Sequence, residues 1–290
     1  MREKVEVNGR VLDNISVDKR VGFIEDTHTY IMLDNAEFKF NSVTTLIKEF
    51  EEEEFISEDV AKKVVASKNS VYYGRDYRDV MEEWVEASRM GTRLHEYGEK
   101  LLNGEIVEEK DIPDSPKAKW VPILIQEIKS KGYELARTEL LVYSEELGLA
   151  GQSDIILKKK RPDSDVYDYM IYDFKFLKDP LKKKSYYNPV SRRYKCMTGP
   201  FRYLQDCNWI HYSIQLAIYQ TLTGDPARVI EKVLVVVNES GYEFHPCYPM
   251  RVFWDEHHQL QAVYETWDGM YYDSRMDCKY KQKPRDIVGY

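Results

Sequence analysis

The sequence predicts an α/β protein in which helices flank a mixed sheet, with the core element order α-β-β-β-α-β. Two spacings of apolar residues carry this prediction. Apolar residues recur every three or four positions, as on one face of a helix, in residues 57–104, 117–132 and 206–224. They alternate or run together, as in strands, in residues 133–145, 149–159, 165–176, 231–240 and 241–249. Because 43% of the 290 residues are hydrophobic, the chain can bury one large core, or a core with an added lobe.

The N-terminal part, residues 1–112, is predicted to hold a hairpin and a helical lobe. Residues 20–40 alternate between polar and apolar side chains, as the strands of a hairpin do. Asn41 and Ser42 can cap a helix over residues 43–54, because their side-chain oxygens accept hydrogen bonds from the first N–H groups of a helix. The residues after this helix, up to the end of the lobe, are expected to be mostly helical.

The core is predicted to span residues 113–270. Its helices over residues 117–132 and 206–224 each end in glycine, which readily adopts the left-handed conformation that follows a helix. Three consecutive strands lie between these helices, and two more strands follow the second one. A last helix is expected over residues 253–270. The polar residues 271–290 are expected to form a tail that wraps the surface or frays.

Charge and cysteine content exclude several classes of protein. The formal net charge of −8 excludes a uniformly basic nucleic-acid coat. The four cysteines are far apart and form no CxxC pair, which predicts reduced thiols and neither a disulfide framework nor a zinc site. The N-terminus has no apolar signal segment, and no apolar run approaches the roughly 20 residues of a membrane helix. We therefore expect a cytoplasmic protein that is neither secreted nor membrane-bound.

The stretch YDFKF at residues 172–176 places two charges in a hydrophobic strand. Because side chains of a strand alternate between its faces, Asp173 and Lys175 point to the same side. If the two strands joined by the turn-rich segment PDSD form a hairpin, Asp154 lies opposite Asp173, with Cβ atoms about 5 Å apart. Opposed carboxylates need a neutralising charge, and carboxylates with a backbone oxygen suit Mg²⁺ or Mn²⁺.

Lys175 would lie beside this cation, where its amine can orient or deprotonate a water or stabilise charge on a phosphate oxygen. Phe174 would point into the core and leave its carbonyl oxygen near the strand end as a third metal ligand. The alternative is a solvated Asp–Lys pair on an exposed strand face, which contributes little to stability. The tripeptide alone favours that alternative, whereas the apolar strand, the hairpin and the element order favour the metal site.

Several motifs, in the same order along the chain, resemble those of the PD-(D/E)xK nuclease superfamily, in its RecB-type branch. The strand motifs are GQSD, which contains Asp154, and YDFK; the helical motifs are GTRLHEYGE, which contains His95, and QLAIY. The segments NSVTTLIKEF and MTGPFRYLQDCNWIHYSIQLAIYQ are similar to blocks of phage and large-virus exonucleases and of a mitochondrial genome-maintenance exonuclease. The resemblance covers roughly residues 27–240 and implies a restriction-endonuclease-like core.

The resemblance also implies roles for individual residues. Asp154 and Asp173 would be metal ligands and Lys175 the catalytic lysine. His95 would reach the metal from the helical lobe, and Glu139 matches an acidic position that often lies near the metals. No iron–sulfur cluster is expected, because Cys196, Cys207, Cys247 and Cys278 all follow the active-site strands and lack the clustered spacing of the relatives that hold one.

Gln215 and Tyr219 match a helix motif that is thought to position DNA or the lysine. They are four residues apart, so they share one helix face with His211. The alternative for Gln215 and Tyr219 is ordinary packing of a helix on a sheet. For His211 we expect a structural hydrogen bond, and for any lone helical histidine such as His95 the spacing alone favours a structural role.

A basic segment lies between Lys158 and Arg202, with thirteen Lys and Arg residues against five Asp. Aromatic residues are interleaved with these charges. Phosphate neutralisation combined with base stacking holds single strands without sequence preference. The residues expected to contact nucleic acid are Lys158, Lys160, Arg161, Lys178, Lys182, Arg192, Arg193, Arg202 and Tyr194. The alternative is a charged, solvated loop.

Motifs and charge together predict a Mg²⁺- or Mn²⁺-dependent deoxyribonuclease. The resemblance implies a phage or viral exonuclease that acts on single-stranded DNA or duplex ends in replication, recombination or repair, with replication or recombination proteins as partners. Two alternatives stay open: an RNA-directed or structure-specific endonuclease of the same fold, and a nucleic-acid-binding protein without catalysis.

Overall fold

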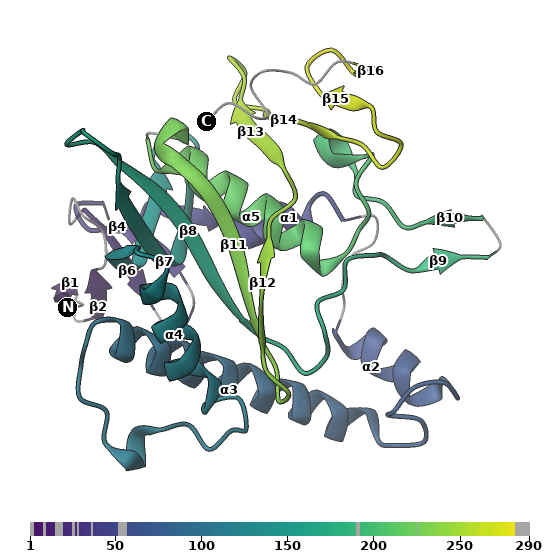
Figure 1. Cartoon of the computed structure of the whole chain (residues 1–290). Coiled ribbons are helices and arrows are strands. Elements are labelled where there is room, and N and C mark those ends of the chain that lie inside the picture. Colours follow the sequence, from purple (N-terminus) through teal and green to yellow (C-terminus); the bar gives the residue numbers. More distant parts are fainter. Residues whose placement is uncertain are drawn as a thin grey trace.

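The computed structural model describes residues 3–7, 10–14, 20–24, 27, 29–35, 37–51, 57–189, 192–224 and 226–281. Figure 1 shows a twisted central sheet with helices on both of its faces. This arrangement confirms the predicted α/β class with a mixed sheet. None of the helices within the described residues is long and apolar enough to cross a membrane.

The middle of the sheet has the strand order β6-β7-β8-β11-β12. These strands are β6 (Glu134–Ser144), β7 (Leu149–Lys160), β8 (Tyr167–Phe176), β11 (Val229–Val237) and β12 (Tyr242–Pro246). β8 and β11 are parallel, whereas the other neighbours are antiparallel. A parallel pair needs a crossover connection, and α5 (Asn208–Leu222) lies in that connection. With α4 (Trp120–Ser130) before β6, the predicted order α-β-β-β-α-β is confirmed.

Helices occupy much of the N-terminal half of the chain. They are α1 (Val43–Lys48), α2 (Ser57–Ala66), α3 (Tyr77–Leu102) and α4 (Trp120–Ser130), with a short 3₁₀ helix at Glu109–Asp111. Further short 3₁₀ helices, at Gly199–Phe201 and Pro226–Arg228, lie later in the chain. Ser42 caps α1 as predicted, because its side chain accepts a hydrogen bond from the Thr45 N–H at 3.0 Å. The predicted helix over residues 43–54 is too long. It ends at Lys48 because Phe50 turns to pack on Phe201, and residues 52–56 lie outside the described residues.

Both faces of β8 are covered, which explains its continuous hydrophobic run. Tyr172 and Phe174 pack in one cluster with residues of α3 and α4. Ile171, on the opposite face of β8, packs in a second cluster with residues of α5. Asp173 and Lys175 alternate with Phe174 along the strand, so they lie on the α5 side of the sheet.

The predicted hairpin over residues 20–40 is confirmed, since β3 (Val21–Ile24) pairs antiparallel with β4 (Thr29–Met32). The same sheet contains β1 (Glu3–Val7), β2 (Arg10–Asn14) and β5 (Lys39–Ser42). Ser42 at the end of β5 lies opposite Ala150 of β7 in a parallel pair. This short pairing joins the N-terminal strands to the core sheet.

The predicted helix over residues 253–270 is wrong. The segment contributes to the antiparallel strands β13 (Met250–Trp254) and β14 (Leu260–Glu265). Asp255 turns the chain between them, because its carboxylate accepts hydrogen bonds from the backbone N–H groups of His257 and Gln259, both at 2.9 Å. The alternate side chains of β14 that point into the core are Leu260, Ala262 and Tyr264.

The predicted loose tail is also wrong for most of its described part. β15 (Tyr271–Asp273) and β16 (Cys278–Tyr280) extend the small sheet of β13 and β14. Tyr272 is fully buried, and the buried carboxylate of Asp273 pairs with the exposed Arg275. Apolar burial of tyrosine rings therefore outweighs the polar composition of this segment, while residues 282–290 lie outside the described residues.

Candidate metal and active site

The candidate site lies where β7 changes its partner. One edge of β7 pairs with β6 along most of its length. On the other edge, β5 pairs with Leu149 and Ala150, and β8 pairs with β7 from Ile155 onward. Within the described residues, no strand pairs with this edge of β7 between these two partners. A pocket of about 400 Å³ opens at this fork, and Gly151, Gln152 and Asp154 line it.

Three acidic residues come from three adjacent strands at this level of the sheet. The β7–β8 ladder places Ile155 opposite Tyr172, which is the predicted register, and Asp154 and Asp173 are the next residues on the two strands. In the β6–β7 ladder, Thr138 pairs with Ile155 and Leu140 pairs with Ser153, so Glu139 lies opposite Asp154. Glu139 has φ +49°, a left-handed conformation that is uncommon for a residue other than glycine. The backbone irregularity at Glu139 therefore lies beside the pocket.

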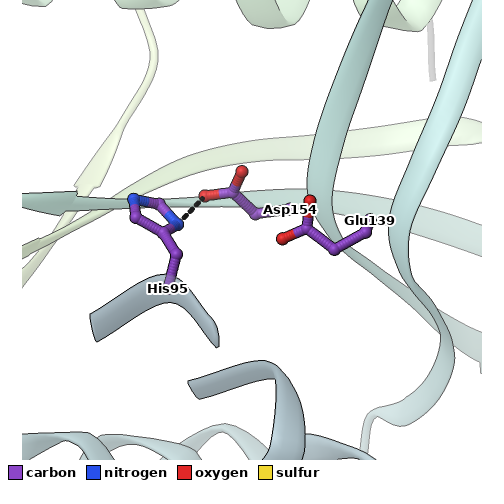
Figure 2. A group of neighbouring side chains, drawn as sticks. All are labelled: His95, Glu139 and Asp154. Atoms are coloured by element: carbon purple, nitrogen blue, oxygen red, sulfur yellow. Dashed lines mark ion pairs between the residues drawn. The ribbon is translucent and has the colours of Figure 1, made fainter. Parts of the chain in front are cut away.

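His95 reaches this row of acids from α3, as Figure 2 shows. Its Nδ1 lies 3.2 Å from Oδ2 of Asp154, and the backbone N–H of Phe174 donates to the same oxygen at 2.8 Å. One ligand atom each from His95, Glu139 and Asp154 all lie within 4.8 Å of one another. Figure 2 shows the Glu139 carboxylate directed towards Asp154. The structure thus brings together three of the residues predicted to surround a metal.

Asp173 lies outside this set and pairs with Lys175, whose Nζ is 2.6 Å from its Oδ2. The predicted common face of these two residues is confirmed. Asp173 is buried, which raises the pKa of its carboxyl to about 6 against the opposing effect of the Lys175 charge. Burial disfavours the Lys175 ammonium, but the charges of Asp173 and Asp154 outweigh burial and raise its pKa above the usual value.

Asp154 and His95 stabilise each other's charged forms. Burial alone would raise the pKa of Asp154, but the charge and hydrogen bond of His95 hold it below its usual value. Burial alone would lower the pKa of His95, but the neighbouring Asp154 carboxylate raises it above its usual value. Two of the three carboxylates, Asp154 and Asp173, are therefore each paired with a basic group, His95 and Lys175 respectively.

Gln215 and Tyr219 of α5 form one wall of the pocket. The Gln215 Nε2 donates to the Tyr219 hydroxyl at 2.8 Å, which confirms that they share a helix face. A Cβ at Gly151 would lie only 2.4 Å from the Tyr219 ring. Gly151 of GQSD and Tyr219 of QLAIY therefore depend on each other, because only glycine leaves room for the tyrosine ring to pack against β7. His211 instead contacts Asp206 at 2.7 Å, which agrees with the structural hydrogen bond predicted for it.

The sequence analysis missed several residues of the site. Tyr30 of β4 lines the pocket, and burial together with the charges of Glu139 and Asp154 raises the pKa of its phenol. The ring of Tyr212 on α5 lies 4.6 Å from the Lys175 Nζ. Further lining residues are Phe23, Ser42, Thr44, Thr92, Glu96 and Gln152. Thr92 could have been found from its helical spacing to His95, whereas no local pattern shows which hairpin residue reaches β7.

The basic residues divide into two groups. Lys158, Lys160 and Arg161 lie at the far end of the β7–β8 hairpin, with Lys160 about 20 Å along the strand from Asp154. These three residues therefore lie away from the pocket, and their contact with nucleic acid stays a prediction. Each also has an acidic partner: Lys158 with Glu134 at 3.5 Å, Lys160 with Asp165 at 2.7 Å and Arg161 with Asp168 at 2.5 Å.

The other basic residues follow β8 in the chain. Lys178 pairs with Glu83 of α3 at 3.3 Å, and Arg202 pairs with Asp277 at 3.1 Å. Lys182 is exposed in the segment that leads to a second, small hairpin of β9 (Tyr187–Asn188) and β10 (Arg193–Tyr194). The remaining predicted contacts, Arg192, Arg193 and Tyr194, are exposed residues of this hairpin.

No protein-family model matches this chain, and no curated protein matches it. The site is thus defined by its geometry: two carboxylates and an imidazole that can share one cation, beside a buried Asp–Lys pair in a pocket.

Proposed function

We propose that this protein is a divalent-cation-dependent deoxyribonuclease with a restriction-endonuclease-like core of the PD-(D/E)xK type, and that it acts as an exonuclease. One observation carries most of the proposal: Glu139, Asp154 and Asp173 stand side by side on three strands, with Lys175 next to them. The sequence motifs that resemble the RecB-type branch contribute residues to this same pocket. Exonuclease action rests on that resemblance alone.

The residues fit Mg²⁺ or Mn²⁺ by ligand type and spacing. Carboxylate oxygens suit both ions. Two adjacent ligands at about 2.1 Å from one octahedral ion lie about 3 Å apart, close to the 3.2 Å between His95 Nδ1 and Asp154 Oδ2. Asp154, Glu139 and His95 would hold the ion, joined by Asp173 and the Phe174 carbonyl. When bound, such an ion supplies positive charge for a phosphate oxygen and lowers the pKa of a coordinated water.

The chain's own residues supply orientation and charge. As an ammonium, Lys175 can donate hydrogen bonds to a phosphate oxygen or to the attacking water, and its neighbour Asp173 keeps it protonated. The Tyr212 ring beside Nζ restricts where the amine can point. Gln215 and Tyr219 close the pocket on the α5 side, so a phosphodiester would enter from the fork between β5 and β8.

Cleavage of end-labelled DNA tests the proposed activity. Wild-type protein with Mg²⁺ or Mn²⁺ should degrade linear DNA, and a chelator should stop the reaction. Asp173→Asn and Lys175→Ala should each lower the rate about 10²-fold or more, because each removes a charge that contacts the reacting groups. Lys160→Ala, at the far end of the hairpin, is the matched control and should cleave like the wild type. Near-wild-type activity of either site variant contradicts the assignment.

Substrate form and metal binding separate the alternatives. Rapid cutting of closed circular single strands would refute exonuclease action, and preferential cutting of RNA would favour the RNA-directed alternative. Calorimetry should show Mn²⁺ binding that is lost in Glu139→Gln. Glu134→Gln, on the same strand but far from the pocket, should bind as the wild type does. Nucleic-acid binding without any cleavage would support the non-catalytic alternative.

A further inference from the structure

The β9–β10 hairpin presents tyrosine rings to solvent. Figure 1 shows this hairpin projecting away from the central sheet and its helices. Tyr187 lies opposite Tyr194 across the two strands, and their rings pack edge to face with centroids 5.2 Å apart. Tyr186, just before β9, is 72% exposed, and Tyr187 and Tyr194 are 46% and 39% exposed. Three neighbouring exposed tyrosines are unusual on a surface that only faces water.

The base of this hairpin is tied to the core. The Lys195 N–H donates to the Tyr186 carbonyl at 3.1 Å, and the Ser185 N–H donates to the Gln205 side chain at 2.9 Å. Lys195 Nζ lies 2.9 Å from a carboxylate oxygen of Asp206, which also contacts His211 of α5. The tyrosines are therefore held by a fixed base close to α5, the helix that carries the Lys175 neighbour Tyr212.

The charge around the tyrosines is entirely positive along the chain. Residues 180–205 contain seven Lys and Arg residues and no Asp or Glu. Lys182 and Lys184 are exposed, and neither forms an ion pair with an acidic residue of the described part of the chain. In the β7–β8 hairpin, by contrast, Lys158, Lys160 and Arg161 each have an acidic partner. Positive charge available to an anion thus gathers beside the exposed rings.

We propose that the β9–β10 hairpin binds single-stranded nucleic acid. Unpaired bases would stack on Tyr186 and on the Tyr187–Tyr194 pair, and Lys182, Lys184 and Arg192 would contact phosphates. Rings of this kind accept any base, because every base has a π-face. In a duplex these faces are already stacked on neighbouring base pairs, so the hairpin selects unpaired strands. The proposal deepens the nuclease function and rests on it for the role of the bound strand as substrate.

The chain itself links this surface to the pocket. β8 carries Lys175 and ends at Phe176, and the segment after it leads to Lys182, whose carbonyl accepts a hydrogen bond from the Trp209 N–H of α5 at 3.2 Å. A strand held on the hairpin would therefore lie on the side of the molecule where β8 ends. This position suits a device that keeps an unpaired end close to the hydrolytic groups.

Fluorescence anisotropy with labelled oligothymidylate and a labelled blunt duplex tests the proposal. A chelator is present throughout, so cleavage does not affect the reading. Tyr186→Ala and the double variant Tyr187→Ala/Tyr194→Ala should each weaken single-strand binding about ten- to hundredfold and leave duplex binding nearly unchanged. Trp267→Ala, which removes another exposed aromatic ring, is the matched control and should bind as the wild type does.

Phenylalanine variants separate stacking from loss of the hairpin. Tyr187→Phe/Tyr194→Phe keeps both rings and should retain single-strand affinity. Lys184→Ala should make the logarithmic salt slope for single strands shallower by about 0.7, as expected for one lost phosphate contact. Unchanged binding in the alanine variants, or equal loss for duplex and single strand, overturns the proposal. Tyrosine-dependent binding without any cleavage would support single-strand binding by the hairpin and refute the proposed nuclease activity. Cleavage with binding that does not depend on the tyrosines would support the nuclease activity and refute the role of the hairpin.

Discussion

The substitution Gly151→Ala tests whether the close contact between β7 and α5 shapes the pocket. The new Cβ would lie 2.4 Å from Cε1 of Tyr219. Ordinary carbon–carbon contacts are about 3.5 Å, so the two groups must separate by about 1 Å. Gly151 is paired with Val142 of β6, and the Tyr219 side chain is buried, so neither can move freely.

The expected loss of stability follows from this crowding. Overpacking in a core costs about 1–3 kcal/mol. If the ring turns away, its hydrogen bond with Gln215 is lost as well, which costs about 1 kcal/mol. We therefore expect Gly151→Ala to lower the free energy of unfolding by about 2–4 kcal/mol and Tm by about 4–8 °C. Cleavage should fall too, because the displaced Tyr219 forms a pocket wall.

Thermal unfolding in a chelator is the assay, combined with a double-mutant cycle. Tyr219→Leu removes the clashing ring, so Gly151→Ala should cost at least about 1 kcal/mol less in that background. Gly91→Ala is the control, because an added Cβ there meets nothing within 4 Å. This variant should be more stable than the wild type, since alanine in place of glycine in a helix interior raises the free energy of unfolding by about 0.5–1 kcal/mol. An unchanged Tm in Gly151→Ala, or purely additive effects in the cycle, would refute the reasoning.

Two further predictions concern lysines. Burial lowers the pKa of Lys232 to about 8, so between pH 8 and its ordinary value of about 10.4 the unfolded chain holds a proton that the folded chain does not. Wild-type stability should therefore rise over that range. Lys232→Met should be more stable than the wild type below pH 8 by up to about 3 kcal/mol, less about 1 kcal/mol for the lost hydrogen bond to Gln220, and urea unfolding at pH 7 and 10.5 should show the advantage disappear. Tyr212→Leu removes the ring beside the Lys175 ammonium, an interaction of about 0.5–2 kcal/mol, and should lower kcat about 3- to 30-fold with KM unchanged. Tyr212→Phe should restore the rate, and equal losses in both variants would argue against the ring contact.

Several features of the site could be predicted because they depend on short stretches of sequence. Strand alternation placed Asp173 and Lys175 on one face, and the turn between β7 and β8 determined that Asp154 would stand opposite Asp173. Helical spacing likewise placed Gln215 and Tyr219 together. These relations follow from the periods of strand and helix and need no knowledge of distant contacts.

Other features could not be predicted because two structures satisfy the same local pattern. In residues 253–270 the apolar spacing suits a helix, but Asp255 turns the chain and Leu260 and Tyr264 pack as strand residues. The basic segment looks uniform in the sequence, yet Lys160 is paired and remote whereas Lys184 is exposed beside the tyrosines. Such differences depend on which acidic side chains the fold brings close.

The sequence by itself determined the order of the core elements along the chain, the register of the β7–β8 hairpin and the identity of the Asp–Lys pair, because periodicity and turn position act over a few residues. Only the tertiary structure decided that β7 changes partner from β5 to β8, that Tyr30 and Tyr212 border the pocket and that Glu139 and His95 come within reach of Asp154. These contacts join segments far apart in the chain, and their distances are set by the packing of helices and strands around a shared core.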